Sequence, residues 1–200
     1  MCQPKIIIVT SCNYYYQTVK YLCDDIIHQS EAVMCYPIPE LENNDAKHVS
    51  RIPRADCLIF VLLTVRDLDF FLRFASDERN AGAISKRRLL VLGKSNLLAL
   101  LIRCYKNIEP LLLATERCTV QSLDHFLCER LRQPTAGAAF GIKSILARCQ
   151  MAVFISLLSG RQAKYAAQER NRSIKTIYAQ RHEVLKKLNC HKLQDIYRYL

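Results

Sequence analysis

The sequence contains no apolar run long enough to cross a membrane. Its longest uninterrupted apolar segments are short, such as Cys57–Leu63, whereas a membrane-spanning helix needs about 18 to 20 apolar residues. The apolar run near the start, Ile6–Val9, is followed at once by polar residues, so the core of a signal peptide is also missing. We therefore expect a cytoplasmic protein that does not act at a membrane.

The pairing of cysteines that marks a metal site or a disulfide framework is also missing. The chain has 10 cysteines, but they form no CxxC pair and no cluster with the spacing of metal ligands. Cys57, Cys104 and Cys128 lie in apolar periodic segments, where cysteine acts as a small hydrophobic side chain. We predict no metal and no cofactor, with a structural zinc or a disulfide as the alternative.

Residue combinations typical of catalysis are equally scarce. Asp24, Asp25, Asp67 and Asp69 are predicted on polar helix faces or in turns, without a convergent histidine or serine. The string at 93–95, Gly-Lys-Ser, resembles the end of a nucleotide-binding P-loop, but an arginine stands where the first glycine is needed. The sequence therefore predicts a protein that is not an enzyme.

Basic charge is abundant, and it is concentrated at one end of the chain. The formal net charge is +11. Residues 1–142 hold 17 Lys+Arg and 15 Asp+Glu, a net of +2, whereas residues 143–200 hold 12 and 3, a net of +9. This local excess favours a negatively charged partner such as nucleic acid.

The first 133 residues alternate strand-like and helix-like patterns, which is typical of a parallel sheet covered by helices. With 50% hydrophobic residues, the chain can bury one good-sized core or two small ones. We predict an α/β fold with a doubly wound five-stranded sheet, whose second strand lies at an edge because Pro37 lacks a backbone donor. The predicted strands are 6–10, 32–38, 57–64, 88–93 and 110–115, and the predicted helices are 18–29, 68–76, 97–105 and 120–133.

The rest of the chain predicts an all-α unit of four helices at 145–200. Residues 134–144, rich in Pro, Gly, Ala and Ser, suit a linker between the two units. Gly160 stands where a helix end favours a residue that tolerates positive φ. Ser173 stands where the long basic helix that follows needs an N-cap. Two helices joined by a tight turn, the second long and basic, are typical of a helix-turn-helix.

This unit resembles the LuxR/GerE-type (NarL/FixJ) DNA-binding domain over about 50 residues. The family pattern has an apolar helix ending in glycine, a Lys-x-Ile-Ala segment, a Ser or Thr N-cap, Thr-Val and a closing Lys-Leu. The residues that match it are Leu146, Val153, Phe154, Leu157, Gly160, Lys164, Ala166, Ala167, Ser173, Lys175, Thr176, Ile177, Lys187 and Leu188.

Five positions depart from the family pattern. Ala147 and Gln150 stand where the family has Thr and Glu, and Arg170 and Arg172 replace two apolar residues; Gln180 replaces the usual His. We expect these losses to loosen the fold and the added arginines to raise the affinity for phosphate.

The helix that starts at Ser173 divides into two faces. Helical periodicity places residues 175, 178, 179, 182 and 186 on one face, and Ile177, Val184, Leu185 and Leu188 on the opposite one. Only the first face can enter a major groove of DNA, and a solvated basic face is the alternative. The candidates for base contacts, which the resemblance also implies, are Tyr178, Ala179 and His182. The candidates for phosphate contacts are Lys164, Arg172, Ser173, Lys175, Thr176 and Arg181.

The N-terminal unit resembles, in architecture, the receiver domain of response regulators. A working receiver needs paired carboxylates after the first strand to hold Mg²⁺ and an aspartate at the end of the third strand to accept phosphate. It also needs a Thr or Ser after the fourth strand and a Lys after the fifth. The corresponding segments here are Thr10–Asn13, Val61–Leu63, Gly93 and Ala114–Thr115. We predict a degenerate receiver without the phospho-aspartate switch; an unrelated α/β unit is the alternative.

A sequence-specific transcription regulator of this kind is expected to dimerise, because one helix-turn-helix covers one half-site. Lys192, Leu193 and Ile196 on the last helix are the candidates for the dimer contact. The degenerate receiver and the RNxSIKTIY-like segment are similar to auxiliary regulators of the BglJ and EcpR kind. That resemblance implies double-stranded DNA and either a homodimer or a heterodimer with an RcsB-type response regulator. The alternative is a protein-interaction module that modulates a partner regulator and binds little DNA.

Overall fold

The first part of the chain forms a parallel sheet. The computed structural model describes residues 5–27, 33–37, 56–77, 80, 88–116, 118–132 and 142–200. The strands of the sheet are β1 (Ile6–Thr10), β2 (Val33–Pro37), β3 (Cys57–Leu62), β4 (Arg88–Gly93) and β6 (Leu112–Ala114). Their order is β2-β1-β3-β4-β6, and every neighbouring pair is parallel. The prediction of an α/β fold with a parallel sheet is confirmed, and β2 lies at an edge as Pro37 indicates.

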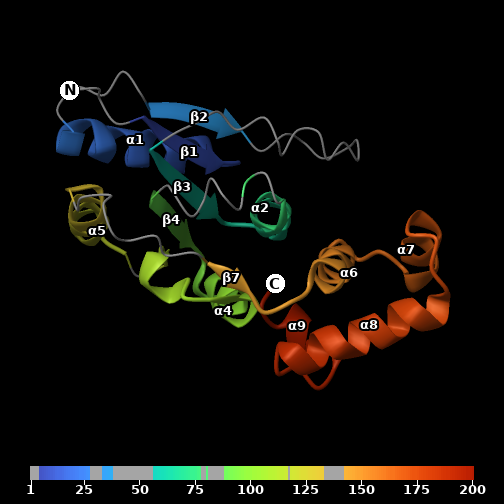
Figure 1. The fold of residues 1–200 in the computed structure, drawn as a ribbon. Coiled ribbons are helices and arrows are strands. Elements are labelled where there is room, and N and C mark those ends of the chain that lie inside the picture. The colour runs from blue at the N-terminus through green and yellow to red at the C-terminus, as the bar shows by residue number, and fades with distance from the viewer. Residues whose placement is uncertain are drawn as a thin grey trace.

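Helices cover both faces of this sheet (Figure 1). They are α1 (Asn13–Ile27), α2 (Val65–Ser76), α4 (Ser95–Cys104) and α5 (Val120–Arg132). Successive strand residues point to opposite faces, so Ile8 and Ile59 pack with α1 and α5. Ile7 and Phe60 pack with α2 and α4 instead. Strands β1, β3 and β4 are therefore buried on both faces, which explains their continuous apolar sequence.

One predicted strand is longer than the strand that the structure shows. The predicted strand at 110–115 begins with a 3₁₀ turn over Glu109–Leu111, because Pro110 has no N–H for a strand ladder and suits the start of a helical turn. The predicted linker at 134–144 lies largely outside the described residues, but its end forms β7 (Lys143–Ser144). This strand pairs in antiparallel fashion with β5 (Tyr105–Lys106), directly after α4.

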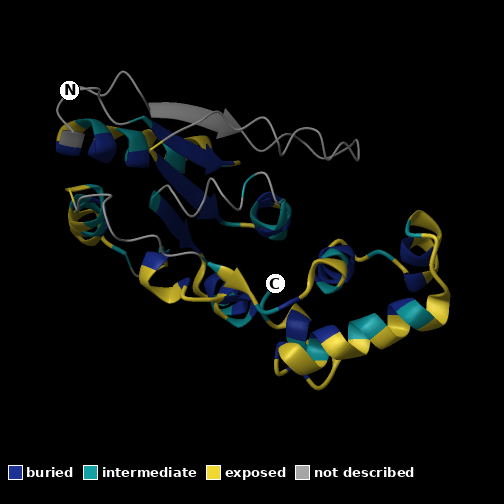
Figure 2. Cartoon of the chain, viewed as in Figure 1, coloured by how far each residue is buried: buried dark blue, intermediate teal, exposed yellow. Residues whose placement is uncertain are grey.

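Four helices follow, as the sequence predicts: α6 (Arg148–Leu158), α7 (Ala163–Glu169), α8 (Ile174–Lys187) and α9 (Leu193–Tyr197). Gly160 adopts the predicted positive φ, 67°, after the end of α6. This helical part packs on the sheet part through α2 and α6. Phe71 of α2 and Phe154 of α6 belong to the same buried cluster. Figure 2 shows that α2 and α6 are largely buried, whereas α8 exposes much of its length.

Hydrogen bonds from Arg103 of α4 also connect the two parts. Its guanidinium donates to the carbonyl oxygens of Leu188 (2.7 Å) and Asn189 (3.3 Å), and it lies 5.2 Å from the ring centre of Tyr199. The end of α8 and the last helix are thus held against α4. No helix in the described part of the chain combines the length and apolar character that a membrane crossing requires.

Candidate nucleic-acid interface

The helix-turn-helix is formed by α7 and α8, with a tight turn at 170–173 between them. Ala163, Ala166 and Ala167 of α7 pack with Val153 of α6 and Ile177 of α8 in one buried cluster. Small alanine side chains let the helices approach closely. Asn171 adopts a positive φ of 49° in the turn, a conformation that asparagine tolerates better than most residues. The turn fixes the start of α8 on the surface beside α7.

Ser173 caps the start of α8, as the sequence predicts. Its hydroxyl oxygen accepts a hydrogen bond from the N–H of Thr176 at 3.0 Å, and it lies 2.8 Å from the Thr176 hydroxyl. A neutral cap leaves the positive end of the helix dipole without an acidic side chain, since the first turn of α8 contains none. This helix end is therefore suited to an external anion.

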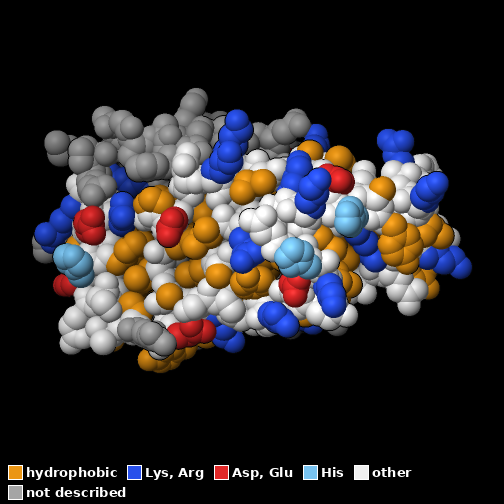
Figure 3. Space-filling view, turned by 90° about the horizontal axis from the view of Figure 1, so that it is seen from below, with side chains coloured by type: hydrophobic (Ala, Val, Ile, Leu, Met, Phe, Trp, Pro, Cys, Tyr) orange, Lys and Arg blue, Asp and Glu red, His pale blue; other side chains and the backbone are white. Residues whose placement is uncertain are grey.

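The two faces of α8 agree with the predicted pattern. Ile177, Val184 and Leu188 are buried, and Leu185 is half-buried. The opposite face is exposed, and it carries Lys175, Tyr178, Ala179, His182 and Lys186. The residues predicted to contact bases thus share one open surface. At the helical end of the molecule, basic and hydrophobic side chains lie side by side (Figure 3).

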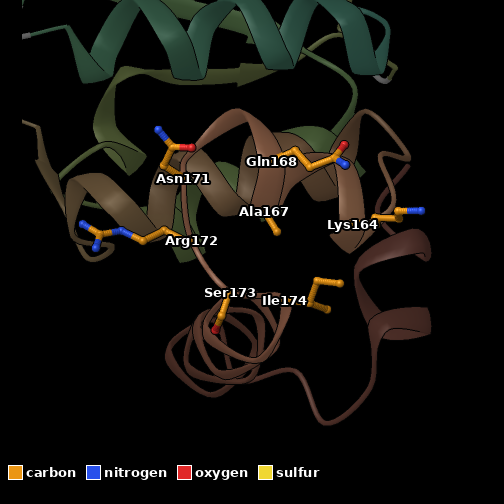
Figure 4. Close-up of a pocket in the computed structure, with 7 residues that line it drawn as sticks. All are labelled: Lys164, Ala167, Gln168, Asn171, Arg172, Ser173 and Ile174. Carbon is orange, nitrogen blue, oxygen red and sulfur yellow. The ribbon is translucent and has the colours of Figure 1, made fainter.

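Several of the predicted phosphate-binding residues surround one shallow pocket between α7 and α8 (Figure 4). Its volume is about 430 Å³. Lys164 of α7, Arg172 of the turn and the cap Ser173 line it, and all three are exposed. Gln168 and Ile174 lie on its wall. The pocket therefore combines two cations with the start of α8, and Lys175 and Thr176 lie in the first turn of this helix.

Arg181 differs from the other predicted phosphate-binding residues. Its guanidinium is half-buried and donates to the carbonyl oxygen of Arg161 at 2.8 Å. It also lies 5.8 Å from the ring centre of Tyr178. Arg181 therefore links α8 to the loop between α6 and α7 and supports Tyr178. This role depends on a carbonyl that is distant in sequence, and no sequence pattern signals it.

Two residues that depart from the family pattern, Gln150 and Arg170, form contacts within the helical unit. The Gln150 side-chain oxygen accepts from the N–H of Ala147 (3.0 Å) and from Lys187 Nζ (2.8 Å), so it caps α6 and contacts α8. Arg170 donates to the carbonyls of Cys149 and Ala152 of α6. Burial lowers the pKa of Arg170. These contacts do not support the expectation that Gln150 and Arg170 loosen the fold, nor the expectation that Arg170 adds affinity for phosphate. Arg172, in contrast, is exposed.

The last helix, α9, places two of the three predicted dimer-contact residues against the chain itself. Ile196 is 1% exposed and belongs to the cluster that joins the helices to the sheet. Leu193 is half-buried against the same cluster. Ile196 and Leu193 pack in a cluster with residues of α4, α6 and α8 of the same chain. Of the three predicted contact residues, Lys192 is exposed.

At the carboxyl edge of the sheet, no carboxylate directly follows β1, β3 or β4 in the part of the chain that the structure describes. Thr10 ends β1 and is followed by Ser11, Leu63 follows β3, and Lys94 follows β4. Asp67 and Asp69 were predicted on a polar helix face or in a turn, but both are buried in α2. Asp67 Oδ2 accepts from the backbone N–H groups of Leu63 (2.9 Å) and Thr64 (2.8 Å) and caps α2. Among the described residues, no group of three or more His, Cys, Asp or Glu could hold a metal ion.

The architecture defines a class: an α/β sheet unit followed by a helix-turn-helix unit. No protein-family model and no curated protein matches the chain. A solved structure of two RcsB dimers bound to two parallel DNAs is 16% identical, with a TM-score of 0.51 over 100% of this chain and 99% of that chain. An RcsB–DNA complex is 18% identical over 100% and 99% of the chains (TM-score 0.49). Full-length FixJ from B. japonicum is 15% identical over 100% and 96% (TM-score 0.42). The chain shares the overall fold of RcsB.

Proposed function

We propose that this protein is a sequence-specific, DNA-binding transcription regulator that acts in the cytoplasm without phosphorylation of its own. The observation that carries the proposal is the open face of α8, which presents Lys175, Tyr178, Ala179 and His182 beside the pocket lined by Lys164 and Arg172. A basic surface at a helix start neutralises phosphates, and side chains along the helix contact base edges. The shared fold with RcsB, which was solved on DNA, supports the proposal.

The side chains at the carboxyl edge support the proposed independence from phosphorylation. An aliphatic residue cannot accept a phosphoryl group, and β3 ends at Leu62, which Leu63 follows. The nearby carboxylate, Asp67, is buried and bound to backbone N–H groups. Control would then come from the abundance of the protein, a small molecule or a partner.

The proposed DNA-bound form is a dimer, either with a second copy or with an RcsB-type response regulator. One helix-turn-helix covers a half-site, and the RcsB structure with the same fold contains dimers on DNA. Because Ile196 is buried in its own chain, the partner contact is expected elsewhere on the surface.

The test is fluorescence-anisotropy binding to genomic DNA fragments at two salt concentrations, with and without an RcsB-type partner. We expect the Lys164→Ala/Lys175→Ala variant to lower the salt slope, d log K/d log[salt], by about 1.8 in magnitude, because each lost phosphate contact lowers it by about 0.9. Lys106→Ala is the matched control, since Lys106 is exposed on β5 and does not line the pocket at the start of α8; it should leave the slope unchanged.

Two outcomes would contradict the proposal. Absence of binding at low salt, with or without the partner, would show that the helix-turn-helix does not bind DNA and would favour the protein-interaction module. An equal loss of affinity in the Lys106→Ala control would show that charge in general, and not this surface, attracts DNA.

A further inference from the structure

The exposed face of α8 lacks the side chains that form the strongest hydrogen bonds with bases. Guanine is recognised most often by arginine, and adenine by asparagine or glutamine, through paired hydrogen bonds in the major groove. None of these residue types is exposed on α8, because Gln180 and Arg181 are half-buried. Arg181 also donates to the Arg161 carbonyl. Lys175 and His182 are the exposed donors in the first half of this face, and neither has the planar fork of arginine.

The same surface exposes apolar atoms instead. Ile174, at the start of α8, is 46% exposed, and Tyr178, one turn later, is 59% exposed. Ala179 is exposed beside Tyr178 and presents its methyl group between Lys175 and His182. Residues four apart on a helix are neighbours, so Ile174 and Tyr178 form one apolar strip along the edge of the face. Figure 4 shows Ile174 next to Ser173 on the side of the pocket that faces Lys164.

Arg181 supports the position of the Tyr178 ring. The Arg181 guanidinium lies 5.8 Å from the ring centre, and the hydrogen bond to the Arg161 carbonyl anchors that guanidinium. A ring held in this way loses less conformational entropy on binding than a freely rotating side chain. The apolar strip is thus prepared for contact with a surface outside the chain.

The charges around the strip indicate which surface covers it. Lys164 and Arg172 flank the pocket at one end, Lys175 lies beside Ile174, and Lys186 lies further along the face. An apolar strip framed by cations fits a surface that is apolar in the middle and anionic at its margins. The major groove of DNA at a thymine has this character, because the C5-methyl group projects into the groove between two phosphate backbones.

We infer that Tyr178, Ala179 and Ile174 recognise thymine methyl groups, so that the protein selects sites with thymines at the positions facing these residues. The inference rests on the proposed function and specifies what the recognition helix reads. Lys175 and His182 form hydrogen bonds with bases at other positions of the same DNA site.

The experiment begins with a pool of random-sequence DNA duplexes, from which the full-length protein selects its preferred sites. Each thymidine of an enriched site is then replaced by deoxyuridine, which keeps the base pair and removes only the C5-methyl group. We expect an affinity loss of about fourfold for each contacted methyl, from the free energy of burying one such group. Tyr178→Ala and Ile174→Ala are tested on the same duplexes, with His182→Ala as the control on α8.

The pattern across variants identifies the contact. We expect Tyr178→Ala to bind the thymine and uracil forms equally at one position, while His182→Ala keeps the full difference there. Such loss of coupling in a double-mutant comparison shows that the two groups touch. Because Tyr178 and Ile174 are exposed, circular dichroism should report unchanged folding of these variants.

Three results would overturn the inference, and they are distinguishable. No enriched sequence would refute the proposed function itself. Enriched sites that tolerate uracil at every position would leave the proposed function intact and refute methyl recognition. Unchanged DNA affinity of Tyr178→Ala, together with lost association with a second copy or a regulator partner, would make the strip a protein contact.

Discussion

The carboxyl edge of the sheet and the start of α8 both present helix N-termini, but they treat them in opposite ways. At the sheet edge, the protein supplies its own anions: Asp67 binds the backbone at the start of α2, and Glu116 accepts from the Ser95 N–H at the start of α4 (3.2 Å). At α8 the cap is the neutral Ser173, with Lys164 and Arg172 beside it. Carboxylates of the chain itself thus meet the positive ends of α2 and α4, whereas the positive end of α8 is left for an external anion.

This contrast agrees with the proposal that the protein acts without phosphorylation of its own. The sheet edge contributes to stability through buried carboxylate contacts, and the helix-turn-helix surface keeps an unfilled charge.

The largest effect is expected in the core that the two regions share. Phe154 of α6 is fully buried in the cluster that also holds Phe71 of α2. We expect Phe154→Ala to lower the free energy of unfolding by about 3 to 5 kcal/mol, because it removes apolar contacts and leaves a cavity. Urea denaturation measures the change. Val120→Ala, at a position 60% exposed, is the control and should change stability by less than about 0.5 kcal/mol.

The second effect tests the sheet edge. Asp67→Ala removes the acceptor of the Leu63 and Thr64 N–H groups and should cost about 1 to 3 kcal/mol of stability, since buried donors are left unpaired. DNA affinity, measured well below the unfolding midpoint, should stay the same. A loss of DNA affinity without a loss of stability would contradict the view that Asp67 is a structural cap.

The third effect tests the start of α8. Ser173→Ala removes the cap bond to the Thr176 N–H, and we expect a loss of about 1 kcal/mol in stability. DNA affinity should fall as well, because the first turn of α8 carries Lys175 and borders the pocket. Under the same conditions, we expect Ser173→Ala to weaken DNA binding and Asp67→Ala to leave it unchanged.

The smallest effect is expected from phosphorylation chemistry. Incubation with acetyl phosphate and Mg²⁺ should add no phosphoryl group to the protein and should leave DNA affinity unchanged, because the end of β3 offers Leu62 and Leu63. Intact-mass spectrometry and anisotropy provide the two readouts. A phosphorylated product whose DNA affinity differs would refute the proposed independence.

Features set by neighbours in sequence were predictable. The apolar runs gave the strands, the three- and four-residue spacing gave α8 and its two faces, and Ser173 and Gly160 gave the ends of helices. These features depend on backbone preferences and on contacts within one or two turns. The candidate site was accessible to sequence reasoning for the same reason, since Lys175, Tyr178, Ala179 and His182 lie on one helix.

Features set by distant partners were decided only by the tertiary structure. Arg170 and Arg181 look like free surface cations in the sequence, but carbonyls of α6 and Arg161 bind them. Ile196 looks like a contact for a partner, but the cluster that joins α2, α4 and α6 buries it. Burial and long-range hydrogen bonds depend on which elements meet in space. The sequence thus determined the helix that carries the proposed DNA-binding face, and the tertiary structure decided which of its charged side chains remain exposed.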